Sequence, residues 1–159
     1  MVQAAIAAED NNFVNHFGID FKAIEKAYEY NKRGKRIRGA STITQQTCKN
    51  IFLWQNRTYV RKALEVYFTL TVELFWSKKR IMEVYLNSIE MGDGIYGIEA
   101  ASQYYFKKPA SKLTPGEAAL IAAIFPNPRH RNPAAPNAYL LNRQKTILNL
   151  MYKIGKINL

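Results

Sequence analysis

The sequence has almost no cysteine, the residue on which small domains stabilised by disulfides or zinc depend. Cys48 is the only cysteine in 159 residues, which excludes an internal disulfide and a cysteine-based zinc cluster. Acidic residues are also scarce, because 12 Asp and Glu stand against 23 Lys and Arg and leave a formal charge of +11. Long apolar runs are missing: the best one, residues 66–76, has about half of the roughly 20 residues that a membrane-spanning helix needs, and it contains Glu73.

The positive charge is concentrated in one part of the chain. Eleven Lys and Arg residues lie between positions 22 and 62, and only Glu25 and Glu29 oppose them. Such a field favours an anionic partner, which can be a nucleic acid, an anionic membrane surface or a phosphorylated substrate. Charge alone does not choose among the three. Within this region we expect residues 31–39, "NKRGKRIRG", to be mobile without substrate.

The apolar spacing predicts a mainly helical chain that forms one domain over residues 1–159. We expect helices near residues 20–30, 42–53, 58–76, 77–87, 114–125 and 138–153, and another after the glycine-rich stretch at 91–97. Two starts carry capping boxes: Thr42 with Gln45, and Thr114 with Glu117. Pro115 is at the first helical position of the second of these helices, where proline is favoured.

A run of neutral hydrogen-bonding side chains lies within "RGASTITQQTCKN", residues 38–50. Part of it serves to begin a helix, through Thr42 and Gln45, but a cap needs only two of these residues. The remainder suits a site that grips sugars and phosphates. Lys49 follows one turn after Gln45, and Arg57 follows the helix, so a phosphate between them would be matched in charge. The alternative for Lys49 is an ordinary solvated lysine.

Two neighbouring carboxylates close an alanine-rich apolar segment, "AIAAED". Partial burial of Glu9 would raise its pKa towards that of a usable base, with Asp10 beside it. The more common outcome for such residues is two solvated charges at a helix end. His16 is expected to form a supporting hydrogen bond, because nothing near it in the sequence has the spacing of metal ligands.

A third carboxylate, Glu65, follows Arg61 by four residues on one helix face. The plain interpretation is a surface ion pair worth a few tenths of a kcal/mol. The functional interpretation is a second carboxylate that Arg61 holds facing Glu9, since two carboxylates that flank a sugar bond are typical of glycosyl chemistry. The spacing leaves open whether Glu9 and Glu65 meet.

Four motifs in order, "EDNNF", "GASTITQQ", "RKALE" and "KRIMEVYLN", resemble those of the peptidoglycan glycosyltransferase family, which includes monofunctional transglycosylases and domains of bifunctional penicillin-binding proteins. The fourth departs from the family pattern by having Met82 in place of Leu. The resemblance covers nearly the whole chain and implies a mainly α, lysozyme-like helical domain. Relatives carry a membrane anchor and further folded residues before the first motif. We therefore expect this chain to be N-terminally truncated relative to the family.

The resemblance implies polymerisation of lipid II into β-1,4-linked glycan with inversion and release of undecaprenyl pyrophosphate. In it, Glu9 matches the catalytic base, Asp10 supports that base, and Glu65 matches a second catalytic-site carboxylate. Lys49 and Arg57 match the pyrophosphate-binding pair, and Arg61 with Lys62 orients the site. The substrate-cleft motif corresponds to Ser41, Thr42, Gln45 and Gln46, and the fourth, mainly structural motif contains Glu83, Tyr85 and Asn87.

The same resemblance implies partners and a location. The partners are lipid II, the growing glycan, a membrane surface and transpeptidases that cross-link the product, with no nucleic acid. The location is the outer, periplasmic face of a bacterial inner membrane. No cofactor is obligatory, and Mg²⁺ or Mn²⁺ near Glu65 is an optional one. Two alternatives remain: a wall-cleaving lysozyme-like hydrolase or lytic transglycosylase, against which Lys49 and Arg57 argue, and a nucleic-acid or membrane-binding module.

Overall fold

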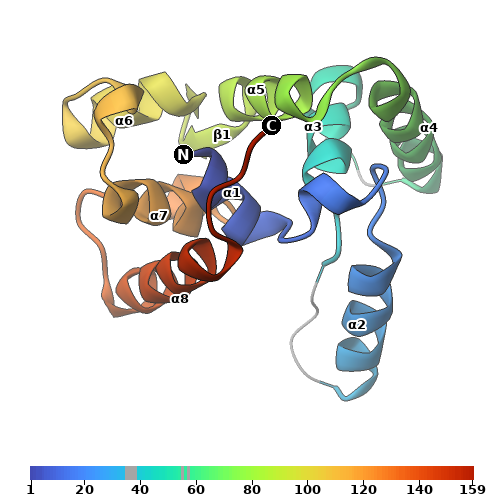
Figure 1. Cartoon of the computed structure of the whole chain (residues 1–159), viewed down its shortest axis with the longest axis horizontal. Coiled ribbons are helices and arrows are strands. Elements are labelled where there is room, and N and C mark those ends of the chain that lie inside the picture. Colours follow the sequence, from blue (N-terminus) through green and yellow to red (C-terminus); the bar gives the residue numbers. More distant parts are fainter. Residues whose placement is uncertain (35–38, 55, 57) are drawn as a thin grey trace.

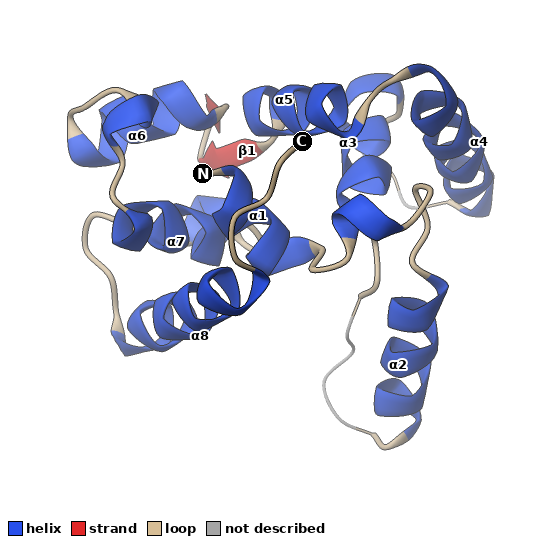
Figure 2. Ribbon diagram, in the orientation of Figure 1, coloured by secondary structure: helices blue, strands red, loops and turns tan. Residues whose placement is uncertain are grey.

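The computed structural model describes residues 1–34, 39–54, 56 and 58–159, and it confirms the predicted mainly helical chain. Figures 1 and 2 show the arrangement of the helices. The α-helices of the described part are α1 (Val2–Glu9), α2 (Phe21–Lys32), α3 (Ile43–Phe52), α4 (Tyr59–Phe75), α5 (Lys78–Ser88), α6 (Ile98–Phe106), α7 (Pro115–Ile124) and α8 (Ala138–Ile154). The segment predicted to be mobile falls largely on residues 35–38, which lie outside the described residues.

One short antiparallel hairpin was not predicted from the sequence. It pairs β1 (Glu90–Gly92) with β2 (Ile95–Tyr96) within the glycine-rich stretch. The strands are too short to show an alternating pattern of apolar and polar residues, so the glycines of this stretch indicated a turn but not the strands on either side of it. Short 3₁₀ turns at Phe13–Asn15, Ala110–Lys112 and Pro128–His130 complete the regular elements of the described residues.

Both predicted capping boxes are present. At the start of α3, Thr42 Oγ1 accepts a hydrogen bond from the Gln45 backbone N–H, and Gln45 Oε1 accepts one from the Thr42 N–H. Thr114 and Glu117 make the same reciprocal pair at the start of α7, with Pro115 in the first turn. Two donors that a helix start would otherwise leave unpaired are thus satisfied at each helix.

The alanine-rich helix α1 lies in the middle of the molecule, between the α7–α8 pair and the elements around α3 and α5 (Figure 1). Its Ala4 and Ala7 pack into one core cluster together with α7 and α8, and its Ala5 and Ile6 pack into a second one with residues of α3 and α5. Small side chains on both faces let neighbouring helices approach α1 closely. The buried helix therefore carries its C-terminal residue, Glu9, to the centre of the fold.

The long helix α4 buries polar side chains and exposes apolar ones. Its buried residues are Arg61, Glu65, Thr69, Val72 and Glu73. The opposite side, which we call the outer face of α4, consists of Tyr59, Val60, Tyr67, Leu70, Leu74 and Phe75, all exposed. The apolar stripe that predicted this helix thus faces mostly away from the core. The helix α2, which also carries exposed apolar side chains, projects from the rest of the molecule (Figure 2).

None of the helices in the described part of the chain combines the length and the apolar character that crossing a bilayer requires.

Candidate active site

A cavity of about 430 Å³ opens beside the C-terminal end of α1. Its wall includes Glu9 and Asp10 from the end of α1, Lys22 and Lys26 from α2, and the segment 39–42 that leads into α3. The cavity therefore joins the first sequence motif to the polar run of the second. It also brings two lysines from α2 to the same space as the carboxylates, which the sequence analysis had counted only as part of a general positive field.

Glu9 is partly buried in this wall and held by one hydrogen bond. Gln46 Nε2, from α3, donates to Glu9 Oε2 at 2.9 Å. Burial raises the pKa of Glu9 above its ordinary value and is the largest influence on it, while the Gln46 hydrogen bond and the charge of Arg143 lower the pKa and Asp10 raises it. The net increase agrees with the expectation that burial at the end of α1 prepares this carboxyl for proton transfer.

Asp10 connects the end of α1 to the start of α3. Its Oδ2 accepts a hydrogen bond from the Ile43 backbone N–H at 3.0 Å, at the first residue of α3. A carboxylate is favoured at a helix N-terminus, where backbone N–H groups are free and the helix dipole is positive. His16 Nε2 lies 3.0 Å from both oxygens of Asp10, which confirms the expected supporting hydrogen bond. Besides its direct charge effect on Glu9, Asp10 thus helps to place the helix that carries Gln46.

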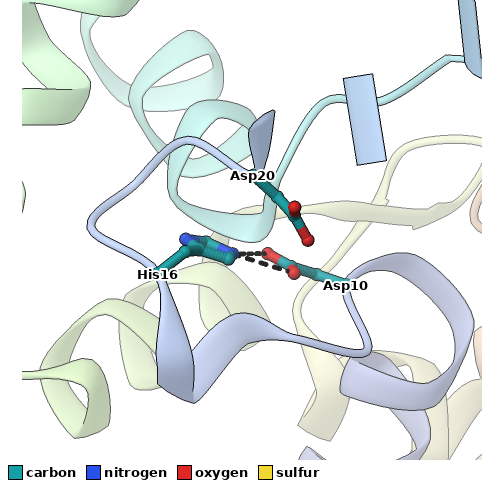
Figure 3. Close-up of side chains that lie close together, drawn as sticks. All are labelled: Asp10, His16 and Asp20. Carbon is teal, nitrogen blue, oxygen red and sulfur yellow. Dashed lines mark hydrogen bonds and ion pairs between the residues drawn. The ribbon is translucent and has the colours of Figure 1, made fainter. Parts of the chain in front are cut away.

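The expectation that nothing near His16 has metal-ligand geometry was wrong. The loop between α1 and α2 folds back, so that Asp10, His16 and Asp20 each bring a ligand atom within 4.8 Å of the others (Figure 3). The hydrogen bonding nevertheless favours a proton on His16 Nε2. If Nε2 bound a metal, the proton would move to Nδ1, which is buried and has no hydrogen-bond partner. Asp20 Oδ1 already accepts from the Ala23 N–H at the start of α2.

Most of the neutral polar run serves the fold rather than the cavity. Thr42 Oγ1 donates to the Gly18 carbonyl at 2.6 Å, in addition to capping α3, and Gln45 completes that cap. Thr44 Oγ1 donates to Glu73 Oε1 of α4 at 2.5 Å. Of the predicted cleft residues Ser41, Thr42, Gln45 and Gln46, only Ser41 and Thr42 line the cavity, and Ser41 is exposed.

Glu65 lies in a separate, buried ion-pair network. Arg61 Nη1 donates to its Oε2 at 2.8 Å and Lys62 Nζ pairs with its Oε1. The Glu65 side chain is only 4% exposed, so the simple surface ion pair considered from the sequence was wrong. Glu65 does not line the cavity beside Glu9, and no hydrogen bond joins the two carboxylates within the described residues. Both carboxylate oxygens of Glu65 are therefore engaged by cationic side chains of α4.

Comparison with known proteins decides the family. The transglycosylase family model matches residues 1–152 of this chain. The chain belongs to the transglycosylase family. Its curated relatives named "biosynthetic peptidoglycan transglycosylase" include one from Bacteroides thetaiotaomicron, 61% identical over 96% of this chain and 62% of the relative. A second, from Escherichia coli, is 58% identical over 96% of this chain and 63% of the relative. A third, from Bdellovibrio bacteriovorus, is 58% identical over 92% of this chain and 59% of the relative.

The transglycosylase chain thus spans about three-fifths of the length of these relatives. Family membership agrees with the resemblance of the four motifs and with the lysozyme-like helical fold that it implied. The prediction that residues 1–159 form one domain is not tested beyond the family match to residues 1–152.

The structure describes only one residue of the expected pyrophosphate pair. Lys49 is partly buried on α3, three residues after Gln46, and it does not line the cavity. Arg57 lies outside the described residues. Among the described residues, the cations that line the cavity are Lys22 and Lys26. A signal for them was present in the sequence, because the two lysines are four residues apart and share one face of a predicted helix.

The residues of the fourth motif divide between core and surface. Tyr85 is fully buried, and its hydroxyl donates to Gln46 Oε1 at 3.3 Å. Glu83 is exposed and pairs with Arg80 at 2.9 Å. Asn87 is exposed too, but its backbone packs against Gly97, where an added Cβ would lie 2.9 Å from the Asn87 carbonyl oxygen. The motif thus positions α5 and the hairpin that follows it.

One further cation was missed by sequence reasoning. Arg143 of α8 donates from Nη2 to the Ala8 carbonyl at 3.2 Å, close to the end of α1, and its charge lowers the pKa of Glu9. The two residues are 135 positions apart in the chain, so no local pattern indicates the contact.

Proposed function

We propose that this transglycosylase chain polymerises lipid II into β-1,4-linked glycan and releases undecaprenyl pyrophosphate. The observation that carries the proposal is the placement of Glu9, a carboxyl with a raised pKa, in the wall of a cavity that Lys22 and Lys26 also line. The names of the curated relatives support peptidoglycan as the material that is synthesised.

In the proposed reaction, Glu9 is the general base. The 4-hydroxyl of the acceptor sugar attacks C1 of the donor, Glu9 takes the hydroxyl proton, and the bond between C1 and the pyrophosphate oxygen breaks. One displacement inverts the configuration at C1. A base with a raised pKa suits this step, because proton transfer is most efficient when the pKa of the base approaches the working pH.

The leaving pyrophosphate needs positive charge where it departs. Lys22 and Lys26 border the cavity that holds Glu9, and cations placed at a developing negative charge lower the barrier. Lys49 and Arg57 are assigned to the same task by resemblance alone. The buried Glu65 pairs with the nearly buried Arg61 and with the exposed Lys62, so we assign it the orientation of these cations.

The cations also separate the transferase from a wall-cleaving hydrolase. A raised pKa at Glu9 would serve a general acid as well as a general base, so it does not discriminate between the two reactions. A glycan strand, however, has no pyrophosphate for the lysines around the cavity to bind. The nucleic-acid alternative explains the charge but not a buried carboxyl among the lysines.

We assign the outer face of α4 to the membrane that carries the substrate. The exposed fractions of Tyr59, Leu74 and Phe75 are 98%, 70% and 75%, and the exposed side chains of Phe52 and Trp54 lie just before this helix in the chain. Apolar and aromatic side chains next to basic ones suit the surface of an anionic bilayer. Because the proposed substrate is lipid-linked, we assign the chain to the outer, periplasmic face of the bacterial inner membrane.

The test is lipid II polymerisation by this chain in detergent, with Glu9→Gln and the exposed Glu99→Gln as a matched pair. We expect glycan polymer from the parent and from Glu99→Gln, and at least a 100-fold loss in Glu9→Gln, since a general base contributes about 10²–10⁴-fold. Near-parental turnover by Glu9→Gln would refute the base. Release of glycan fragments from purified cell wall, without polymer from lipid II, would establish the hydrolase instead.

A further inference from the structure

We infer that Gln46 and Tyr85 form a positioning pair that holds the Glu9 carboxylate with one oxygen anchored and the other directed to the reaction. The inference rests on the proposed function, in which Glu9 is the base. It gives Gln46 a task other than the contact with substrate that the motif resemblance implied.

Three helices meet in this arrangement. Glu9 ends α1, Gln46 lies on α3 and Tyr85 on α5. Gln46 Nε2 donates to Glu9 Oε2 at 2.9 Å, and Gln46 Oε1 accepts from the Tyr85 hydroxyl at 3.3 Å. Both ends of the amide are therefore engaged, and no other hydrogen bond to either of its atoms is found within the described residues.

The carboxylate and the tyrosine hydroxyl together fit one orientation of the Gln46 amide. Burial raises the pKa of Tyr85 well above its ordinary value, and the nearby charges of Glu9 and Asp10 raise it further, so its hydroxyl remains a donor. The ionised carboxylate of Glu9 only accepts, so it requires the N–H group of Gln46, and the amide oxygen is left to accept from the Tyr85 hydroxyl. If the amide turned over, oxygen would face carboxylate and the contact would become repulsive.

The anchored geometry leaves one oxygen for chemistry. Oε2 of Glu9 accepts from Gln46, whereas Oε1 accepts no hydrogen bond from the described residues, and Glu9 lines the cavity. A base held by one oxygen keeps its second oxygen oriented without an entropic cost at each turnover. The Gln46 hydrogen bond also lowers the pKa of Glu9 against the effect of burial.

Several charged groups lie near Glu9, in addition to the neutral Gln46. Arg143 reaches the end of α1 from α8, Asp10 is the next residue in the chain, and Lys22 and Lys26 face the same cavity from α2. None of these is changed by a substitution at position 46. A pH shift after such a substitution therefore reports on the Gln46 contact itself.

The experiment compares Gln46→Met and Tyr85→Phe with a matched control. Gln103→Met is that control, since Gln103 Nε2 donates to Glu99 Oε1 at 3.0 Å in an equivalent but exposed pair on α6. Two quantities are measured: the ¹³C-carboxyl titration of Glu9, assigned with Glu9→Gln, and the pH profile of kcat/KM for lipid II. Circular dichroism and thermal unfolding check that each variant is folded.

We expect Gln46→Met to raise the Glu9 pKa by about one pH unit, as the loss of a hydrogen bond to a charged group implies. The acidic limb of kcat/KM should move to higher pH by the same amount, with KM nearly unchanged. Tyr85→Phe should shift both in the same direction by less, and Gln103→Met should shift neither. A purely structural defect would instead lower kcat equally at every pH.

The two proposals fail separately. If Glu9→Gln still polymerises lipid II, Glu9 is not the base, and the carboxyl titration alone then tests the contact with Gln46. If Glu9→Gln is inactive but the titration and the acidic limb are unchanged in both Gln46→Met and Tyr85→Phe, the positioning pair is overturned and the base stands. Should Gln46→Met fail to fold, Tyr85→Phe decides.

Discussion

Glu9→Gln should make the folded protein more stable at neutral pH while it removes the proposed base. Burial raises the pKa of Glu9 above its ordinary value of 4.5, so the native state favours the protonated carboxyl more than the unfolded chain does. As pH rises from the unfolded value through the folded one, this preference is lost and the ionised side chain costs stability. Glutamine keeps the shape and the acceptor for Gln46 but carries no charge.

The size of the effect follows from the pKa difference. Each unit by which burial raises the pKa corresponds to about 1.36 kcal/mol between the two protonation states. A chain of this length changes its Tm by about 2–4 °C for each kcal/mol. Glu9→Gln should therefore raise Tm at pH 8 by about 3–5 °C for each unit of pKa increase, and the gain should shrink towards zero as pH falls to about 4.

The assay is thermal unfolding followed by circular dichroism from pH 4 to pH 8, with Glu99→Gln as a control of opposite sign. The pKa of the exposed Glu99 is lowered by hydrogen bonds from the Ala110 N–H and from Gln103, so its ionised form is favoured in the folded state. Glu99→Gln should be slightly destabilising above the unfolded pKa, with a difference that disappears at low pH. A Tm gain for Glu9→Gln that does not depend on pH, or a loss at pH 8, would refute the reasoning.

Three further predictions concern the loop, the membrane face and the metal. Gly18→Ala should lower the free energy of unfolding by about 2–4 kcal/mol in urea titrations, since its φ is +76° and a Cβ would lie 2.6 Å from an α4 side chain. Gly94→Ala, with φ +69° and open space, should cost only the conformational part; equal losses would exclude the clash. Leu74→Glu should weaken co-sedimentation with phosphatidylglycerol-containing vesicles about tenfold, because burial of a leucine contributes about 1.5–3 kcal/mol. The control Leu141→Glu, at another exposed leucine, should not weaken it. Equal binding by the two variants would show that the outer face of α4 does not contact the membrane. The rate of lipid II polymerisation in EDTA should stay within about twofold of the rate without it, because Arg61 and Lys62 already contact both oxygens of Glu65. A complete loss of activity that Mg²⁺ restores would contradict this.

Local chemistry made the helices predictable from the sequence. Thr42 with Gln45, and Thr114 with Glu117, mark helix starts through contacts three residues apart, and both boxes are present. For Glu9 the sequence left both partial burial and solvation open, whereas these helix starts were unambiguous. Such signals depend only on neighbours in the chain, so one sequence is sufficient to read them.

The orientation of α4 could not be predicted in this way. Its periodicity shows that apolar and polar side chains occupy opposite sides, but it does not show which side meets the protein. Arg61, Glu65 and Glu73 face inwards because partners from α3, from the start of α5 and from α4 itself satisfy their charges. The apolar side is then left outward, against the usual rule for a water-soluble helix.

Contacts between distant segments account for the remaining differences. Asp20 meets Asp10 and His16 only because the loop after α1 folds back, and Arg143 reaches the end of α1 across most of the chain length. Lys22 and Lys26 share a helix face in the sequence, but only the fold shows that the face borders the cavity with Glu9. In each case the sequence shows a charged or polar residue but does not show which distant residue it will contact.

The use of a neutral donor, Gln46, to hold Glu9 has an electrostatic reason. A lysine in place of Gln46 would also hold the carboxylate, but its full charge in a partly buried site would lower the pKa of Glu9 far more than an amide does. The base would then be too weak to take a proton from a sugar hydroxyl. The Gln46 amide holds the carboxylate in place while lowering its pKa less than a lysine would, and the Tyr85 hydroxyl hydrogen-bonds to the oxygen of that amide. Positive charge can then be kept for the part of the cavity that Lys22 and Lys26 border, where a departing anion needs it.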